Sequence, residues 1–486
     1  MRTSIDVLAF DLGASSGRAM LGSFDGGRIT LQEVHRFPNT YHLLGGRAYW
    51  DMLTIIENVK NGIAKCGVKP AGIGLDTWGV DFGLLDKAGA LVSLPRSYRD
   101  SAFNEKNMME AVDALGGSSF IYHQTYLSNL TINPLFQLYS MKQREEAAFE
   151  SAHTLLMMAN LIEYFLTGVK HSEYTAAATS QLYNMKEKTW SKPLLEKLGF
   201  PAERLTEVEL PGRQLGFLLP SIAEETGKQG VPVISVAGHD TAGAIMAVPS
   251  SRRNFTYLSS GTWSLMGYVS DLLLDDETSG ISNEGNWNGA YRPNVNISGL
   301  WILQESRRYW QSEGKQYSYD ELEALAAKTP PLRSLIRPDD FEKVNGAYPA
   351  QIRAYCRKTG QAVPESTGEV VRCILDSLAL KYRQVYERFK PRMERGNGLY
   401  IVGGGVKNRL LSQTAANALD MPVTAGPPEA SALGNILMQL ETLGEIRGPE
   451  QRSGIIGASF GKEEFLPQDR ARWDEAYARF LNLYAE

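Results

Sequence analysis

The chain has 486 residues, of which 43% are hydrophobic and 22% are charged, and its formal net charge is −5. This composition is typical of a globular protein and argues against a disordered or fibrous one, while the lack of a long basic run in the sequence argues against nucleic acid as the main partner. The length predicts two domains, or three.

Cysteine content and the N-terminal sequence bear on where the protein works. Cys66, Cys356 and Cys373 are too few and too widely spaced for a disulfide framework or a zinc site. The first residues do not resemble a signal peptide, and no stretch approaches 18 consecutive apolar residues. We therefore expect a cytoplasmic monomer or small homo-oligomer that acts on a small-molecule substrate, with neither nucleic acid nor a membrane as partner.

The first motif is DLGASSGR, residues 11–18. Apolar residues around it predict strands at 7–12 and 18–24, and a further strand is expected at 29–37. Because the turn leads into a strand rather than a helix, it is neither a P-loop nor a dinucleotide-binding turn. A hairpin of small residues can still present backbone N–H groups to phosphate. Asp11 then either holds a hydrated Mg²⁺ or is a turn aspartate satisfied by local N–H groups.

The second motif, GLDTWGVDFGLLD at residues 74–86, starts within an expected strand. Gly79 would let a polar substrate approach the backbone closely, and Trp78 could pack on the face of a sugar. The alternative is a hairpin with a core tryptophan and with Asp76 and Asp81 solvated. Taken by itself, the second motif favours the hairpin.

The third motif, GHDTAGA at residues 238–244, lies between an expected strand and a helix of small residues. A carboxylate at the start of a helix is favoured in its ionised form, which suits Asp240 to act as the base in phosphoryl transfer. Asp240 could instead be a helix cap. His239 is expected to bind substrate or to pack in the core, because no second histidine lies at metal-ligand spacing.

The strand–turn–strand pattern returns near the middle of the chain. Residues 254–259 and 263–269 are expected strands, with the turn Ser260-Gly261-Thr262 between them. We interpret this as an internal structural repeat, which predicts two domains of similar design with a cleft between them. The domain boundary is expected near residue 249.

The second half of the chain contains the clearest helical pattern. Apolar residues from Val371 to Phe389 are spaced 4, 3, 4, 3 and 4. A strand at 399–402, three glycines at 403–405 and a helix from 407 follow, and glycines at a strand end allow an adenine ring and its ribose to lie on the backbone. A plain strand-to-helix turn is the alternative. Residues 446–486 are expected to form a polar connector and an amphipathic tail.

These motifs occur in the order found in a known family. The chain also contains YLSSGTWSLMG (257–267), NISGLWILQ (296–304), ESTGEVVRCILDSLALKY (365–382) and IVGGGVKN (401–408). Over residues 5–445 it resembles the FGGY carbohydrate kinases of the actin-like ATPase superfamily. The resemblance implies an α/β fold with two actin-like (ribonuclease H-like) ATPase domains flanking an interdomain catalytic cleft. The corresponding division is an N-terminal domain (1–248), a C-terminal domain (249–445) and an extension (446–486).

Site residues implied by the resemblance fall into groups by ligand. Those implied to contact ATP are Ala14, Ser15, Ser16, Gly17, Arg18, Thr262, Gln304 and Gly404. Those implied to surround the sugar are Gly79, His239, Asp240, Thr241 and Asn296. The resemblance further implies Mg²⁺ near Asp11 and Asp240 as the catalytic base.

The implied reaction transfers the γ-phosphoryl group of ATP to a ketose. The turn at Trp78 and the segment after Asp240 match family members that act on L-rhamnulose better than those that act on fuculose or xylulose. The resemblance therefore implies L-rhamnulose 1-phosphate and ADP as products. The alternatives are a kinase for another ketose such as L-fuculose, or a non-catalytic actin-like ATP-binding switch.

Overall fold

The computed structural model describes residues 4–341, 346–393 and 398–485. The predicted domains begin at residue 1 and end at residue 486, and residues 1–3 and 486 lie outside the described ranges. The chain forms two compact units. Unit 1 consists of Met1–Ser251, Ser270–Pro293 and Ala430–Phe460, and unit 2 consists of Arg252–Val269, Asn294–Glu429 and Gly461–Glu486. Each unit is therefore built from segments that are not consecutive, whereas the predicted division has three consecutive segments. The first segment of unit 1 ends at Ser251, close to the boundary expected near residue 249.

Unit 1 is built on a six-stranded sheet whose order is β13-β14-β6-β1-β2-β3. Its strands are β1 (Ile5–Leu12), β2 (Ser16–Phe24), β3 (Ile29–Pro38), β6 (Ile73–Thr77), β13 (Arg213–Phe217) and β14 (Pro232–Ser235). β1 is antiparallel to β2 and parallel to β6. Its residues from Val7 to Phe10 are 0% exposed, as expected for a central strand that is covered on both faces. The three strands predicted around the first motif are confirmed.

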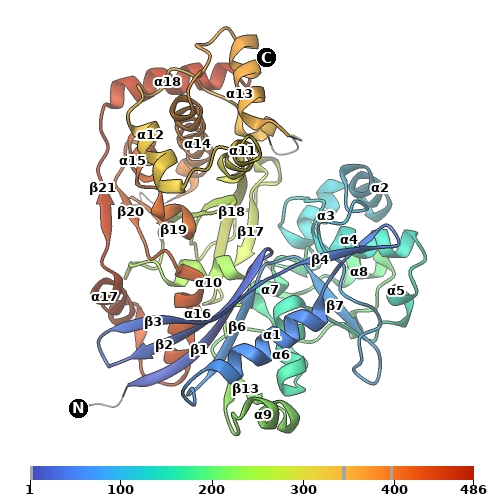
Figure 1. Ribbon diagram of the computed structural model, residues 1–486. Coiled ribbons are helices and arrows are strands. Elements are labelled where there is room, and N and C mark those ends of the chain that lie inside the picture. Colours follow the sequence, from blue (N-terminus) through green and yellow to red (C-terminus); the bar gives the residue numbers. More distant parts are fainter. Residues whose placement is uncertain (1–3, 342–345, 394–397, 486) are drawn as a thin grey trace. The chain divides into compact units, whose positions relative to one another are not determined.

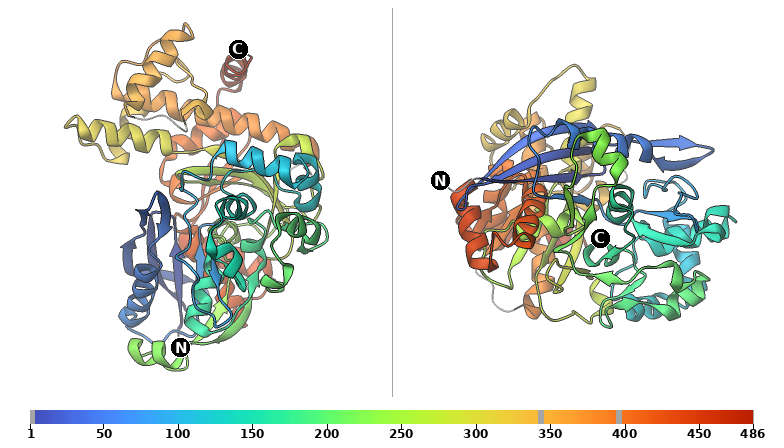
Figure 2. Two further views of the ribbon diagram at one scale, coloured as in Figure 1. Left: turned by 90° about the vertical axis from the view of Figure 1, so that its right-hand side faces the viewer. Right: turned by 90° about the horizontal axis from the view of Figure 1, so that it is seen from below.

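Helices cover both faces of this sheet, and glycines let them approach it closely. A Cβ atom at Gly62 of α1 (Met52–Lys65) would lie 2.7 Å from the Phe10 ring. On the opposite face, a Cβ atom at Gly22 would lie 2.7 Å from Ile436 of α16 (Ala430–Thr442). Figures 1 and 2 show the red helix α16 beside the blue N-terminal strands. Residues with side chains at these two positions would push the helices away from the sheet.

The segment Ala430–Phe460 belongs to unit 1 because α16 bonds to the sheet through buried polar side chains. Asn435 Nδ2 donates to Asp76 Oδ2 at 2.7 Å. One turn further along, Gln439 Nε2 donates to the carbonyl oxygen of Leu8 at 3.0 Å. These bonds connect the helix to strands that precede it by more than 350 residues.

The rest of unit 1 contains a second apolar core. Its helices are α2 (Glu105–Leu115), α3 (Ser118–Thr125), α4 (Pro134–Gln143), α5 (Ala147–Ser151), α7 (Tyr174–Ala177) and α8 (Lys192–Leu198). The short paired strands are β4 (Tyr41–Leu44) with β5 (Arg47–Trp50), β7 (Phe82–Leu85) with β8 (Thr154–Met157), β9 (Ser172–Glu173) with β12 (Val208–Glu209), and β10 (Tyr183–Asn184) with β11 (Thr189–Trp190). Unit 1 also contains α6 (Met158–Thr167), α9 (Pro220–Thr226), α10 (Asp240–Met246), β17 (Ser282–Gly285) and α17 (Gly448–Phe460).

Unit 2 repeats the central topology of unit 1. β15 (Thr256–Ser260) forms a hairpin with β16 (Trp263–Tyr268) and is parallel to β19 (Leu399–Val402), as β1 forms a hairpin with β2 and is parallel to β6. The sheet continues on one side to β18 (Tyr291–Ser298) and on the other to β20 (Val423–Ala425) and β21 (Glu463–Phe465). The predicted structural repeat is therefore confirmed.

The helices of unit 2 follow sequence signals at their ends and on their faces. α14 (Thr367–Phe389) begins at a capping box, in which the side chains of Ser366 and Glu369 accept from each other's backbone N–H groups. The other helices are α11 (Trp301–Ser312), α12 (Tyr319–Ala327), α13 (Tyr348–Lys358), α15 (Arg409–Leu419) and α18 (Arg470–Asn482). The expected polar connector after residue 446 is instead regular structure, because α17 is a helix, β21 joins the sheet and α18 buries Trp473 and Phe480.

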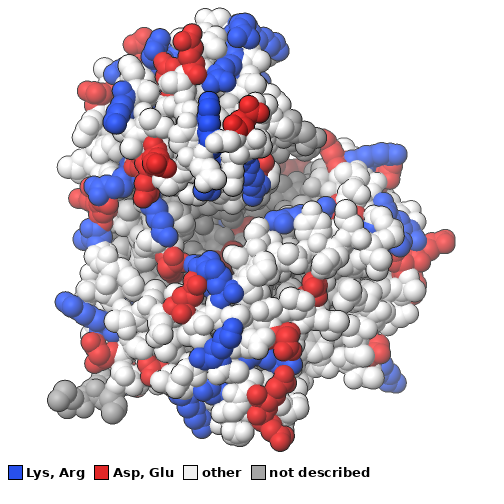
Figure 3. Space-filling view, viewed as in Figure 1, with Lys and Arg blue, Asp and Glu red and all other residues white. Residues whose placement is uncertain are grey.

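Charged side chains of both signs are interspersed on the face shown in Figure 3. On this face, a mixture of both signs argues against strong attraction to a single class of charged partner. Among the helices of the described residues, none combines the length and the apolar character needed to cross a membrane.

Candidate active site

The first hairpin turn, between β1 and β2, is fixed by hydrogen bonds across it. Gly13 N donates to the carbonyl oxygen of Ser16 at 3.0 Å. Asn39, which follows β3, donates from Nδ2 to the carbonyl oxygen of Gly13 at 2.8 Å. Hydrogen bonds therefore hold the turn where phosphate contacts are expected. The predicted ATP-binding residues at its partly exposed tip are Ala14, Ser15 and Ser16.

Ser16 is the first residue of β2, and the other two predicted residues of this motif follow it in the same strand. A Cβ atom at Gly17 would lie 2.3 Å from the Phe37 ring, so packing alone requires glycine here. Arg18 pairs in register with Asp11 and forms an ion pair with its carboxylate. Asp11 therefore has the guanidinium group of Arg18 beside it, and this group places positive charge next to the first hairpin turn.

The carboxyl ends of three neighbouring strands bring the predicted residues of unit 1 together. Asp11 of β1 pairs in register with Asp76 of β6. Thr77, at the end of β6, forms a parallel bridge with His239 after β14, and its N donates to the carbonyl oxygen of Gly238 at 3.0 Å. Because parallel strands end at one edge of a sheet, the three motifs of the first half meet at that edge, where ligands of α/β sheets bind.

Asp240, the predicted base, is the first residue of α10 and is accessible. Its side chain is 31% exposed, whereas that of His239 is 10% exposed. His239 Nε2 lies 3.5 Å from Asp240 Oδ1, and Thr241 Oγ1 donates to the same oxygen at 3.2 Å. The loop therefore presents three adjacent polar side chains, one of which is a carboxylate that can accept a proton.

A buried glutamate holds the backbone of this loop. Glu173 Oε2 accepts from Gly238 N at 2.9 Å, and Thr175 Oγ1 accepts from His239 N at 3.1 Å. Burial raises the pKa of Glu173, and the N–H and O–H donors around it oppose this rise. The sequence analysis missed both supporting residues because they lie outside every motif and are brought to the loop only by the fold.

Asp76 is buried, so the prediction that it is solvated is wrong. It is 0% exposed, and its Oδ2 accepts from Asn435 Nδ2 at 2.7 Å. Burial raises the pKa of Asp76 well above its ordinary value, and the negative charges of Asp11 and Asp240 raise it further. The partner that makes this burial possible comes from α16, more than 350 residues later.

Asp81 is buried as well and forms the centre of an aromatic cluster. Its Oδ2 accepts from the indole Nε1 of Trp50 at 2.6 Å and of Trp78 at 2.9 Å. Tyr98 N donates to the same oxygen at 3.3 Å, and Gln137 Nε2 donates to Oδ1 at 3.0 Å. Burial raises the pKa of Asp81 to about 6 against the lowering effect of these donors. The expected core tryptophan is confirmed, whereas the expected solvated aspartate is wrong.

Gly79 lies beside the His239 ring. A Cβ atom at Gly79 would lie 3.3 Å from His239 Nε2 and 3.2 Å from Thr179 Cγ2. The next residue, Val80, has a φ of 67°, which is rare for a β-branched residue, and its N donates to Thr179 Oγ1 at 3.1 Å. β6 pairs with β1 whereas β7 pairs with β8. The second motif is therefore a sharp turn between two sheets, and the hairpin expected from its residues is wrong.

A cation near the first hairpin turn was missed by the sequence analysis. Arg99 Nη2 donates to Ser15 Oγ at 3.4 Å, and its guanidinium lies over the rings of Tyr41 and Tyr98. Burial raises the pKa of Tyr98, and the charge of Asp240 contributes to the rise. Tyr98 and Arg99 belong to the segment PRSYRD (95–100), which is too short to be a motif. The arginine next to a tyrosine is the signal that could have found them.

In unit 2 the second hairpin turn contacts the start of α11. Leu300 N donates to the carbonyl oxygen of Gly261 at 2.9 Å, and Trp301 N donates to that of Thr262 at 3.1 Å. Thr262 Oγ1 donates to Gln304 Oε1 at 3.2 Å. Two of the residues predicted to bind ATP are therefore hydrogen-bonded to each other.

The glycine triplet packs against the same turn. Gly403 has a φ of 87°, and a Cβ atom there would lie 2.8 Å from the carbonyl oxygen of Ser260. A Cβ atom at Gly405 would lie 2.0 Å from Ser260 Oγ, whereas no described residue comes within 4 Å of a Cβ atom at Gly404. Packing thus accounts for the outer two glycines, and the exposed middle one leaves bare backbone that a flat ligand could cover.

The predicted sugar-binding residues are divided between the units. Asn296 is an exposed residue of β18 in unit 2, opposite Leu265 of β16. The other four, Gly79, His239, Asp240 and Thr241, lie together in unit 1.

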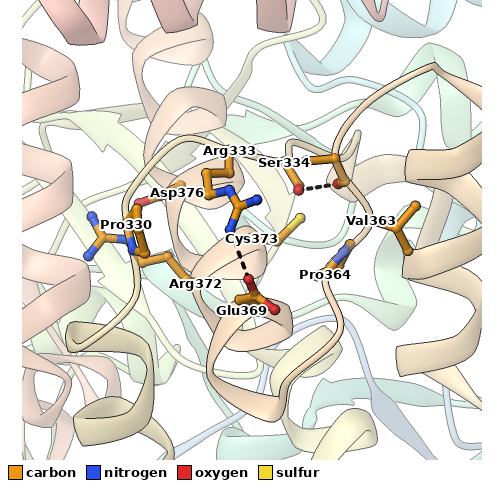
Figure 4. A pocket seen from close by; sticks show the side chains of 10 residues that line it. Pro330, Arg333, Ser334, Val363, Pro364, Glu369, Arg372, Cys373 and Asp376 are labelled. Atoms are coloured by element: carbon orange, nitrogen blue, oxygen red, sulfur yellow. Dashed lines mark hydrogen bonds and ion pairs between the residues drawn. The ribbon is translucent and has the colours of Figure 1, made fainter.

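A small cavity in unit 2 lies away from the predicted residues. Its volume is about 10 Å³, which is room for about one water molecule. Figure 4 shows the ion pair of Arg333 with Glu369 and the sulfur of Cys373 at its wall. The cavity is therefore too small for a nucleotide or a sugar.

Two family models together cover most of the chain. The N-terminal domain model of the FGGY family of carbohydrate kinases matches residues 7–247, and the C-terminal domain model matches residues 256–442. The chain therefore belongs to the FGGY family of carbohydrate kinases, as the motifs predict. A rhamnulokinase from Bacteroides thetaiotaomicron is 42% identical to it over 98% of each chain, and a rhamnulokinase from Pectobacterium atrosepticum is 40% identical over 98% of this chain and 96% of its own.

Solved structures share the fold of the whole chain. A ligand-bound xylulose kinase from Lactobacillus acidophilus superposes with a TM-score of 0.80 at 16% identity, covering 99% of this chain and 98% of its own. A glycerol kinase from Plasmodium falciparum with ADP gives a TM-score of 0.79 at 13% identity and the same coverage. At such identities the likeness concerns the fold alone, which is the two-domain, mixed α/β fold of carbohydrate kinases.

Proposed function

We propose that this protein transfers the γ-phosphoryl group of ATP to O1 of L-rhamnulose, giving L-rhamnulose 1-phosphate and ADP. The observation that carries this proposal is the similarity to a rhamnulokinase that is 42% identical over 98% of both chains. The loop Gly238-His239-Asp240, called the Gly-His-Asp loop below, then supplies the residues for phosphoryl transfer.

In the proposed reaction, Asp240 accepts the proton of the C1 hydroxyl group of the ketose. O1 forms a bond to the γ-phosphorus while the bond from this phosphorus to the β–γ bridging oxygen breaks, and that oxygen leaves with ADP. The assignment is supported by access, since the Asp240 side chain is 31% exposed whereas Asp76 and Asp81 are 0% exposed. Gly79, His239, Thr241 and Asn296 are assigned to the sugar.

The hairpin turns are assigned to the phosphates of ATP. Successive backbone N–H groups in small-residue turns bind anions, and fixed donors stabilise charge that develops on the transferring group. Residues 14–18 in unit 1 and Thr262 in unit 2 are the proposed phosphate contacts. Gln304 and the bare backbone at Gly404 are the proposed contacts of the nucleoside.

Asp11 is assigned to a magnesium ion that is bound together with ATP. The described ranges contain no group of three or more candidate ligand residues that could hold a metal ion. Mg²⁺ usually needs only one or two carboxylates together with substrate phosphates. Asp76, whose buried Oδ1 has no hydrogen-bond partner among the described residues, lies opposite Asp11 in register. When bound, Mg²⁺ would neutralise charge on the β- and γ-phosphates.

We also propose that the protein works in the cytoplasm as a monomer or small homo-oligomer. ATP is the proposed donor, and all three cysteines are free and buried, which suits a reducing compartment.

The test is a comparison of kcat/KM for L-rhamnulose, L-fuculose, L-xylulose and glycerol with ATP and Mg²⁺. We expect the highest value for L-rhamnulose, and phosphorus–proton coupling in the product should place the phosphate on O1. The Asp240→Asn variant, purified in the same way, serves as the control for contaminating kinases.

Two outcomes would contradict the proposal. A clear preference for another ketose would make the protein a kinase of different specificity. ATP binding without phosphorylation of any sugar would favour an ATP-binding switch instead.

A further inference from the structure

A fully buried arginine lies behind the Gly-His-Asp loop. Arg292 belongs to the part of β18 that lies in unit 1, and it is 0% exposed. Its Nε donates to the carbonyl oxygen of Gly285 at 2.7 Å, and its Nη2 donates to Glu284 Oε2 at 2.9 Å. A buried charge is costly unless it is paired, and Glu284 provides the opposite charge.

The same guanidinium nitrogen contacts the histidine of the site. Arg292 Nη2 lies 3.2 Å from His239 Nδ1. A guanidinium group can only donate hydrogen bonds, so His239 Nδ1 must accept. The proton of the neutral His239 ring is therefore on Nε2, since the hydrogen bond made by one ring nitrogen sets the state of the other.

The protonated nitrogen faces the proposed sugar site. His239 Nε2 lies 3.5 Å from Asp240 Oδ1, and it lies 3.3 Å from where a Cβ atom would be at Gly79. An N–H group at this place can donate to a ketose oxygen held beside the proposed base. The other tautomer would present a bare acceptor to the sugar and to the Asp240 carboxylate.

We propose that Arg292 is a positioning residue that fixes His239 as the Nε2–H tautomer and so makes it a hydrogen-bond donor to the ketose. This inference rests on the proposed function, because it takes His239 as a sugar contact. Arg292 itself does not touch the substrate and acts only through His239.

The surroundings predict what happens when Arg292 is removed. Glu284 Oε2 already lies 3.5 Å from His239 Nδ1. Without the guanidinium group, this carboxylate is an acceptor close to Nδ1 and favours a proton there. We therefore expect Arg292→Met to change His239 to the Nδ1–H tautomer, whereas the donor in Arg292→Lys should keep the Nε2–H tautomer.

The tautomer is measured by ¹⁵N NMR of protein labelled at histidine, because the protonated and the bare nitrogen of a neutral imidazole resonate far apart. The His239 signals are assigned by their loss in His239→Gln. We expect protonated Nε2 and bare Nδ1 in the wild type and in Arg292→Lys, and the reverse in Arg292→Met. A wild-type His239 with protonated Nδ1 would overturn the proposal.

Steady-state kinetics separate positioning from general loss of structure. In Arg292→Met we expect KM for the ketose to rise roughly 10- to 100-fold, the cost of an unmade hydrogen bond to a buried polar group, while KM for ATP stays unchanged. Arg292→Lys should restore most of the loss. Equal effects on both KM values, or none on either, would contradict the proposal.

A matched control and a second variant keep the test decisive. Arg452 is also a buried arginine of unit 1 and pairs with Glu441 Oε1 at 2.6 Å, so Arg452→Met should leave the His239 signals and both KM values unchanged. If Arg292→Met does not fold, the second variant Arg292→Lys and the wild type still test the proposal, because both are expected to have protonated Nε2 and bare Nδ1. The NMR measurement needs no substrate, so failure of the proposed function and failure of this inference are distinguishable.

Discussion

Three carboxylates near one sheet edge have different surroundings, and these decide what each can do. Asp240 is partly exposed and adjoins other polar side chains. Asp76 is buried beside the charges of Asp11 and Asp240, which raise its pKa in addition to burial. Asp81 is buried among indole N–H donors. Of the three, Asp240 is the accessible carboxylate, and Asp76 and Asp81 are held by buried hydrogen bonds.

Asp81 should make stability depend on pH in a defined direction. Burial raises its folded-state pKa from 3.8 to about 6. The folded protein therefore retains a proton that the unfolded chain loses, so this stabilising contribution is complete below pH 3.8 and is lost as the pH rises to about 6. A rise of the pKa from 3.8 to about 6 corresponds to about 3 kcal/mol. Asp81→Asn lacks this contribution because it cannot ionise.

The measurement is chemical unfolding of wild type and Asp81→Asn from about pH 4.5 to pH 7. The free energy of unfolding of the wild type, relative to that of the variant, should decrease as the pH rises through this window. Parallel pH profiles would mean that Asp81 keeps an ordinary pKa in the folded state.

At the scale of elements, the contact between α16 and α10 is closer than any side chain allows. A Cβ atom at Gly434 would lie 1.8 Å from the carbonyl oxygen of Gly243. Backbone cannot yield as the end of a side chain can, so Gly434→Ala should lower the free energy of unfolding by about 1–3 kcal/mol or more. Urea unfolding followed by circular dichroism measures this change.

Gly454 in α17 is the matched control for this prediction. It is an exposed helical glycine with no described residue within 4 Å of a Cβ atom, so Gly454→Ala should raise the free energy of unfolding by about 0.5–1 kcal/mol. If both alanine variants change stability in the same direction, the helix contact is looser than the structure shows.

Local elements were predictable from the sequence where one pattern decides them. The strands around the first motif and the helix Thr367–Phe389 follow from apolar spacing and a capping signal. The second motif was not predictable, because its two strands pair with partners distant in sequence. The motif is therefore a junction between two sheets, where its residues predict a hairpin. Its buried aspartates depend on donors such as Asn435 and Trp50, which no local pattern reveals.

At the scale of the whole molecule, the chain builds two units of related topology from separate segments. The repeat was predictable because both hairpins have the same order of strand, small turn and strand. The membership of Ala430–Phe460 in unit 1 was not, since it rests on the buried bonds of Asn435 and Gln439 to the first sheet. The site residues that the family motifs name stay predictions, and the supporting residues Glu173 and Arg292 emerged only from the fold.

The C-terminal helix α18 should stabilise unit 2 specifically. Trp473 is 2% exposed and packs with Leu335 and Leu380 in one apolar cluster. Trp473→Ala should cost about 3–5 kcal/mol. Hydrogen exchange should then show loss of protection in α14 and α15 of unit 2, with protection in β1 and β6 of unit 1 retained.

Leu481 on the same helix provides the control, since it is 40% exposed. Leu481→Ala should leave exchange in both units near the wild-type pattern. Loss of protection spread evenly over both units in Trp473→Ala would instead mean that the two units unfold as one.

The most direct test of catalysis by Asp240 is the turnover of Asp240→Asn with L-rhamnulose, measured together with its affinity for ATP. A general base contributes roughly 10²- to 10⁴-fold, so kcat should fall by that factor. The dissociation constant of ATP should stay within about twofold of the wild-type value, well below the tenfold change that about 1.4 kcal/mol would cause. A variant that phosphorylates the ketose at the wild-type rate would contradict the assignment of Asp240 as the base.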